Sequence, residues 1–139
     1  MKKEGVMNTR TVRILMAKFG EGRESAMMKL AFAFRDEGYE VIYTEIQKPG
    51  AIVAAAIQES VDHIGITTLP GSRIEDLARV VELLKQENAS DIRVTAGGVL
   101  DCDDALKIKE TGVVEFFPQG TSISELLQWA KDNIKPTCG

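Results

Sequence analysis

Histidine and cysteine are scarce in this chain of 139 residues, which has one histidine, His63, and two cysteines, Cys102 and Cys138. A structural zinc site takes four nitrogen or sulfur ligands in most cases, so these three residues leave too few. A nucleophile activated by imidazole has a single candidate base. The cysteines are far apart and outside any C-x-x-C spacing, which is typical of free thiols in a reducing compartment.

A basic excess and a long apolar run are also missing. The 17 basic and 21 acidic residues give a formal net charge of −4, whereas nucleic-acid-binding domains are usually basic. No stretch approaches the ~20 apolar residues that span a membrane. The N-terminus leads into no apolar signal core. We therefore expect a cytoplasmic protein with no nucleic-acid partner and no membrane partner.

The chain has the length and apolar content of one domain. Single domains most often contain ~100–150 residues, and 44% of this sequence is hydrophobic. The first ten and last five residues lack the patterning of the rest. We expect one domain over residues 11–134, with a flexible N-terminus at 1–10 and a flexible C-terminus at 135–139.

Short apolar runs alternate with segments of helical periodicity along this domain. The apolar and β-branched runs predict five strands, at Val12–Ala17, Val41–Thr44, Val61–Thr67, Ile92–Ala96 and Val113–Phe117. The segments between and after them predict helices at Glu24–Glu37, Ala51–Ser60, Ser72–Glu87, Asp103–Thr111 and Ser122–Asn133, with Ser72 as an N-cap. Parallel neighbours need crossover helices, so the alternation predicts a doubly wound, five-stranded parallel α/β sheet with helices on both faces. We expect the flavodoxin-like strand order 2-1-3-4-5, which is common at this size.

Glycines gather in the loops that follow the carboxyl ends of the predicted strands. The loops at 18–23, 67–72, 96–101 and 117–121 hold half of the 12 glycines, namely Gly20, Gly22, Gly71, Gly97, Gly98 and Gly120. Ligands of such sheets bind beyond the carboxyl ends of the strands, where glycine lets a ligand approach the backbone. With the hydroxyls of Thr67 and Thr121, the glycines indicate a binding face, although ordinary turn chemistry is open for each glycine taken singly.

The first of these loops matches no complete phosphate-binding motif. Residues Gly20–Ser25 lack the second glycine and the lysine of a P-loop. The dinucleotide motif G-x-G-x-x-G/A fits them except for the final serine, with Glu45 available to a ribose. Lys18 and Arg23 would favour an anion at the start of the first predicted helix. A nucleotide-binding or anion-binding module is therefore an alternative.

Five blocks of sequence, in register, resemble the cobalamin-binding domain of methylmalonyl-CoA mutase and related carbon-skeleton mutases. They are Arg13–Gly20, Gly38–Val41, Gly65–Leu69, Val94–Val99 and Phe117–Thr121. Together they run through most of the chain. The resemblance implies a cobalamin cofactor whose displaced nucleotide tail inserts beside the sheet.

The resemblance also implies which residues hold that tail. Thr67 and Leu69 match the family's S-x-L motif, and Gly97 with Gly98 matches its glycine pair. Gly120 and Thr121 correspond to the last loop, near the outer part of the tail.

The family's D-x-H-x-x-G motif, whose histidine is the lower cobalt ligand, reads Glu21-Gly22-Arg23-Glu24-Ser25-Ala26 here. Arg23 stands in place of the histidine, beside Gly22. A guanidinium has no lone pair to donate, so Arg23 cannot coordinate cobalt. His63 precedes the third predicted strand, and we expect it at the amino end of the sheet, away from the site. The expected site therefore has no protein ligand to the metal.

These observations lead to two hypotheses about function. In the first, the chain binds a corrinoid with altered or lost cobalt ligation and acts as a small subunit beside a large mutase subunit, not being catalytic alone. In the second, it is a non-binding pseudo-domain that regulates or assembles a partner, or forms a homo-oligomer. The helix at Glu24–Glu37 is apolar nearly all round, which fits burial against a partner or side chains that fill the vacated slot.

Overall fold

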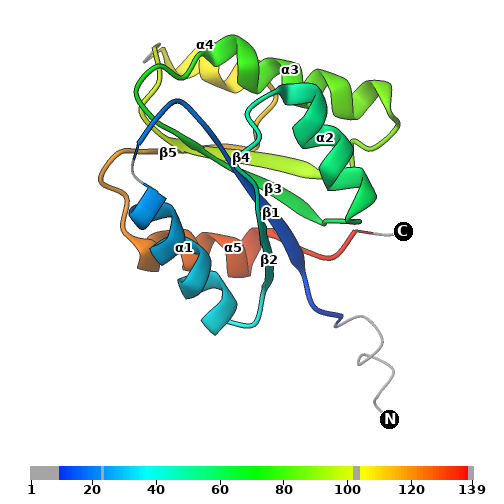
Figure 1. The fold of residues 1–139 in the computed structure, drawn as a ribbon, viewed down its shortest axis with the longest axis vertical. Helices are drawn as coiled ribbons and strands as arrows, with labels where there is room; N and C mark the ends of the chain where they lie inside the picture. Colours follow the sequence, from blue (N-terminus) through cyan, green and yellow to red (C-terminus); the bar gives the residue numbers. More distant parts are fainter. Residues whose placement is uncertain (1–9, 23, 102–103, 138–139) are drawn as a thin grey trace.

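The computed structural model describes residues 10–22, 24–101 and 104–137, which form a five-stranded sheet between two layers of helices (Figure 1). All of its strand pairs are parallel, and the strand order is β2-β1-β3-β4-β5. The strands are β1 (Arg13–Phe19), β2 (Glu40–Tyr43), β3 (His63–Thr68), β4 (Arg93–Gly98) and β5 (Glu115–Pro118). The predicted fold class and strand order are confirmed.

The five helices divide between the two faces of the sheet. Their bounds are α1 (Glu24–Asp36), α2 (Pro49–Gln58), α3 (Ile74–Gln86), α4 (Ala105–Glu110) and α5 (Ile123–Asn133). Helices α1 and α5 lie together on one side, and α2, α3 and α4 lie on the other (Figure 1). No helix in the described part of the chain is long and apolar enough to cross a membrane.

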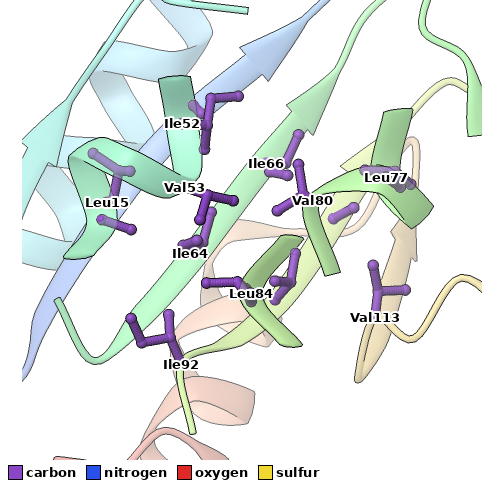
Figure 2. Close-up of a cluster of buried hydrophobic side chains, with 14 of the residues drawn as sticks. Leu15, Ile52, Val53, Ile64, Ile66, Leu77, Val80, Leu84, Ile92 and Val113 are labelled. Carbon is purple, nitrogen blue, oxygen red and sulfur yellow. The ribbon is translucent and has the colours of Figure 1, made fainter. Parts of the chain in front are cut away.

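The larger hydrophobic core lies under α2 and α3. Alternate residues of the central strands supply it from the sheet, including Leu15, Ile64 and Ile66, and Figure 2 shows helix side chains such as Ile52 and Leu77 closing over them. A smaller cluster on the other face contains Ile14, Met16, Ala31, Phe34, Ala130 and Ile134. The α1–α5 side therefore has the smaller buried hydrophobic cluster of the two faces.

Ser72 does not cap α3 as the sequence predicts. The N-cap is Arg73, and it makes no side-chain cap bond. The Ser72 hydroxyl instead accepts from the Leu69 amide at 2.8 Å, and its one proton can be donated to the carbonyl of Phe19 or of Leu69, at 2.8 and 2.6 Å. Ser72 is buried because it joins the loops that follow β1 and β3 at the carboxyl edge of the sheet.

Asp62, just before β3, holds the two ends of the described chain together. Its buried carboxylate accepts from the Arg10 guanidinium at 2.5 and 3.0 Å, from the Arg13 amide at 2.8 Å and from the Thr137 amide at 2.9 Å. Arg10 and Thr137 belong to the terminal segments predicted to be flexible. Both are tied to the sheet by this one carboxylate.

Candidate functional site

A cavity of about 530 Å³ lies between the sheet and the helices α1 and α5. We call it the slot. Its floor is formed by β3 and β4, and its walls include Met27, Leu30 and Phe34 of α1 and Leu126 and Trp129 of α5. Its mouth, at the carboxyl edge of the sheet, is formed by the strand ends and following loops at 67–70, 97–99 and 117–121. Cavities of this size and mostly apolar lining hold small molecules and cofactors.

The floor of the slot is low because two of its positions are glycines. Side chains alternate between the faces of a strand, so His63, Gly65 and Thr67 of β3 face the slot while Ile64 and Ile66 enter the larger core. In the neighbouring strand Gly65 pairs with Thr95 and Thr67 pairs with Gly97. The two glycines and two threonines make a shallow floor lined with hydroxyls.

Gly98 brings the backbone of the mouth close to β3. Its φ is +125°, and a Cβ at this position would lie 2.2 Å from the carbonyl oxygen of Thr68. The Thr68 hydroxyl donates to the Gly97 carbonyl at 3.0 Å. A side chain at position 98 would push the β3 and β4 loops apart, so only glycine permits this mouth.

The far end of the slot, at the amino edge of the sheet, contains a buried polar pair among aromatic side chains. His63 is 3% exposed, and its Nε2 lies 3.0 Å from the Thr95 hydroxyl. The ring centroid of Trp129 is 6.3 Å from that of His63 and 5.5 Å from that of Phe117. Burial and the Arg93 guanidinium lower the pKa of His63 to about 3, against the opposing effect of Asp62. The imidazole is therefore neutral at neutral pH.

The loop after β1 is held from the side by Gln47. Its carboxamide accepts from the Gly20 amide and donates to the Gly20 carbonyl, both at 3.0 Å. Gly22 follows with a φ of +104°, exposed and outside the lining of the slot. Arg23 lies outside the described residues. The same is true of Cys102, which the sequence places near the mouth.

Six of the eight predicted cofactor-binding residues come together at the mouth of the slot. They are Thr67, Leu69, Gly97, Gly98, Gly120 and Thr121. The expectation that His63 lies away from the site is wrong. It begins β3 at the amino edge, as predicted, but the slot extends along the whole strand and reaches it.

Sequence reasoning missed Gly65, Thr95 and Trp129 as lining residues. Gly65 lies two positions before Thr67, and strand alternation alone puts both on one face. Thr95 stands in the same relation to Gly97. Trp129 gave no such signal, because a single aromatic residue on an amphipathic helix is read as core.

Of the two cations of the alternative anion site, the described chain contains Lys18 but not Arg23. Lys18, one of the two cations proposed for an anion site, is buried at 3% exposure. The described residues contain no group of three or more His, Cys, Asp or Glu side chains that could hold a metal ion.

Met27, Phe34 and Phe117 line the slot, yet they leave its volume open. The α1 side chains therefore form a wall of the slot and do not fill it.

The sequence is similar to one family throughout this region. A family model described as the B12 binding domain matches residues 13–128. The small subunit of 2-hydroxyisobutanoyl-CoA mutase from Aquincola tertiaricarbonis is 37% identical over 117 residues, which cover 83% of this chain and 86% of that subunit. Methylmalonyl-CoA mutase from Escherichia coli (strain K12) is 32% identical over 116 residues, which cover 82% of this chain and 16% of that enzyme. The chain thus matches nearly a whole small subunit and only a minor part of the larger mutase.

Solved structures with the same fold include a cobalamin-binding protein and a chemotaxis protein. The first, from Desulfitobacterium hafniense DCB-2, has a TM-score of 0.73 and 17% identity over 88% of this chain and 59% of that one. The second, CheY4 of Vibrio cholerae, has a TM-score of 0.68 and 15% identity over 88% of this chain and 98% of that one. At these identities the likeness shows the fold alone.

Proposed function

This chain belongs to the B12-binding domain family, and from that premise we propose that its slot receives the nucleotide tail of cobalamin. The single observation that carries the proposal is the open slot of about 530 Å³ at the carboxyl edge of β3 and β4. Thr67, Gly97 and Gly98 would contact the tail at the mouth. Leu69, Gly120 and Thr121 would border its outer part.

The residues present fit such a tail in shape and in chemistry. A Cβ on Gly97 would lie 2.9 Å from the Phe117 carbonyl oxygen, so the floor at that point has no room for a side chain. The Thr67 hydroxyl can hydrogen-bond a ribose or a phosphate, and the Thr121 hydroxyl, which donates to the Pro118 carbonyl at 2.7 Å, can accept from a ribose hydroxyl. The apolar walls from α1 and α5 suit the faces of an aromatic base.

Arg23 bears on how the metal would be held. When bound, cobalamin would supply a cobalt centre able to take a nitrogen ligand. With its tail in the slot, the cofactor's own base would not be available as that ligand. Arg23 offers no lone pair in place of the family's histidine. We therefore expect a bound corrinoid without a protein nitrogen on the metal, held by its tail alone.

Electron paramagnetic resonance of cob(II)alamin mixed with the protein tests this arrangement. The expected result is a corrinoid that is retained through gel filtration and shows no splitting from an axial nitrogen. Splitting that changes in protein labelled with the heavy nitrogen isotope would mean a protein ligand. Splitting that does not change would mean that the cofactor docks with its own base attached. Failure to retain any corrinoid would favour the non-binding pseudo-domain.

Arg23→His is the matched gain-of-function variant. It restores an imidazole at the position of the family's ligand, and we expect about tenfold tighter cobalamin binding, with splitting that follows the isotope label. Arg23→Gln removes the positive charge without adding a cobalt ligand and serves as the control. Equal dissociation constants for the histidine and glutamine variants would contradict a tail seated in the slot beneath this loop.

We further propose that the chain acts as the corrinoid-carrying subunit of a two-part mutase. Its match to 86% of a mutase small subunit supports this role. A separate large subunit would then bind the acyl-CoA substrate, because the cofactor tail would take up the slot.

A further inference from the structure

His63 is the one ionisable side chain on the floor of the slot within the described residues, and the function proposed above leaves it without a role. It lies at the far end, where the surrounding side chains of Ile14, Phe34, Trp129 and Ile134 are aromatic or aliphatic. An imidazole buried to 3% exposure is costly there unless both of its nitrogens are satisfied. The buried ring therefore needs a hydrogen-bond partner for each of its nitrogens.

Only one of the two ring nitrogens has a partner among the described residues. Nε2 is 3.0 Å from the Thr95 hydroxyl, and Nδ1 makes no hydrogen bond there. His63 lines the slot, so a molecule at the far end would lie beside its ring. A neutral imidazole has one donor and one acceptor nitrogen, so Nδ1 offers one hydrogen bond to whatever occupies the far end.

Resting on the proposed tail-binding function, we propose that His63 selects the base at the end of that tail, in favour of a purine over dimethylbenzimidazole. The outer edge of dimethylbenzimidazole consists of C–H and methyl groups, which would leave Nδ1 desolvated and unpaired. Adenine presents an amino donor next to a ring-nitrogen acceptor. It can therefore pair with Nδ1 in either tautomer, with Thr95 taking the complementary role at Nε2.

The neighbouring side chains position such a base without choosing it. Trp129 stands 6.3 Å from His63 and tilted to it by 58°, and Phe117 meets Trp129 edge-on at 5.5 Å. Aromatic walls of this kind stack on any flat base. A site built to hydrogen-bond a ligand discriminates against an analogue that lacks the partner atom, because its buried polar group is then unpaired. His63 and Thr95 therefore discriminate between the two bases.

Binding of three corrinoids tests the proposal: an adenine-containing cobamide, cobalamin with its dimethylbenzimidazole, and cobinamide, which has no nucleotide tail. For the wild-type protein we expect the adenine-containing cobamide to bind about tenfold more tightly than cobalamin. Cobinamide should bind most weakly. His63→Val should bring the two cobamides to within about twofold of each other, while His63→Gln, which keeps a hydrogen-bonding side chain, should retain part of the preference.

Thr67→Val is the matched control, because Thr67 lies on the same strand face but at the mouth. It should weaken both cobamides in proportion and leave their ratio unchanged. Cobamides that bind better than cobinamide, with a ratio that His63→Val does not alter, would overturn the role of His63 and leave the proposed function standing. Cobinamide binding as tightly as both cobamides, or no binding of any corrinoid, would refute the proposed function itself.

Discussion

At the scale of single residues, His63 couples the slot to the stability of the protein. Its ring is enclosed beside Thr95 and Trp129, and the Arg93 guanidinium disfavours a positive charge on it. In the unfolded chain the same imidazole is in water and takes up a proton at its ordinary pKa. Acid therefore favours the unfolded state through this one group.

We predict that the free energy of unfolding falls as the pH is lowered from about 6.5 toward about 4, by up to about 1.4 kcal/mol per pH unit. The sign follows from a folded pKa of about 3 against 6.5 in the unfolded chain, since the unfolded state binds the extra proton between those values. Urea titrations at a series of pH values measure the slope, and His63→Val should flatten it. Asp62 titrates below its ordinary 3.8 and contributes outside this range. Identical slopes for the two proteins would show that His63 is not held neutral.

At the scale of elements, the slot exists because β3 and β4 are unlike on their two faces. The face toward α2 and α3 carries Ile64, Ile66 and Val94, which are buried in the larger hydrophobic core. Figure 2 shows Ile64 and Ile66 among the helix side chains of this core. The face toward α1 and α5 carries glycines and threonines in paired positions. One pair of strands thus provides both the hydrophobic core and the floor of a binding site.

Gly65→Val is predicted to close the slot without harming the fold. A Cβ on Gly65 would meet only the Thr95 hydroxyl, at 3.8 Å, and valine is well suited to a strand. The added methyl groups would occupy the middle of the floor, so we expect cobalamin affinity to fall at least tenfold, with a melting temperature near that of the wild type. Gly50→Val adds the same groups on α2, on the far side of the sheet, and should leave binding unchanged. If Gly65→Val binds cobalamin as tightly as the wild type, the tail does not lie on this floor.

Whether the residues of such a site can be predicted from sequence depends on where they lie along the strands. The alternation of apolar runs and helical segments was enough for the parallel sheet, because parallel neighbours need crossover helices. The strand order followed because it is the common one at this size. The mouth was predictable from glycines and threonines at strand ends. The floor was not, since β3 reads as a strand whether position 63 faces a cavity or a core. Only the packing of α1 and α5, which leaves a gap above His63 and Gly65, distinguishes the two.

At the scale of the whole molecule, one carboxylate joins the chain ends to the amino edge of the sheet. Burial raises the pKa of Asp62, but hydrogen bonds from Arg10, Arg13 and Thr137 outweigh that effect and bring it below its ordinary value. The Arg10 guanidinium also donates to the Thr137 carbonyl at 3.1 Å. Asp62 immediately precedes His63, so this junction lies next to the far end of the slot.

Asp62→Asn is predicted to lower the free energy of unfolding by about 2–3 kcal/mol at neutral pH, because an amide cannot accept from all three donors and leaves Arg10 without its counter-charge. The difference from wild type should shrink as the pH falls below 3.8, because the carboxyl of the unfolded wild type takes up a proton there, while the folded carboxyl, with its lowered pKa, does so only at still lower pH. Glu82→Gln is the control, since the ion pair between Arg79 and Glu82 is also within hydrogen-bond distance, at 3.0 Å, but exposed. Its removal should cost within about 0.5 kcal/mol. If denaturant titrations give the two variants equal losses, the ends of the chain are not held by Asp62 in solution, and the amino edge of the slot is freer than its hydrogen bonds indicate.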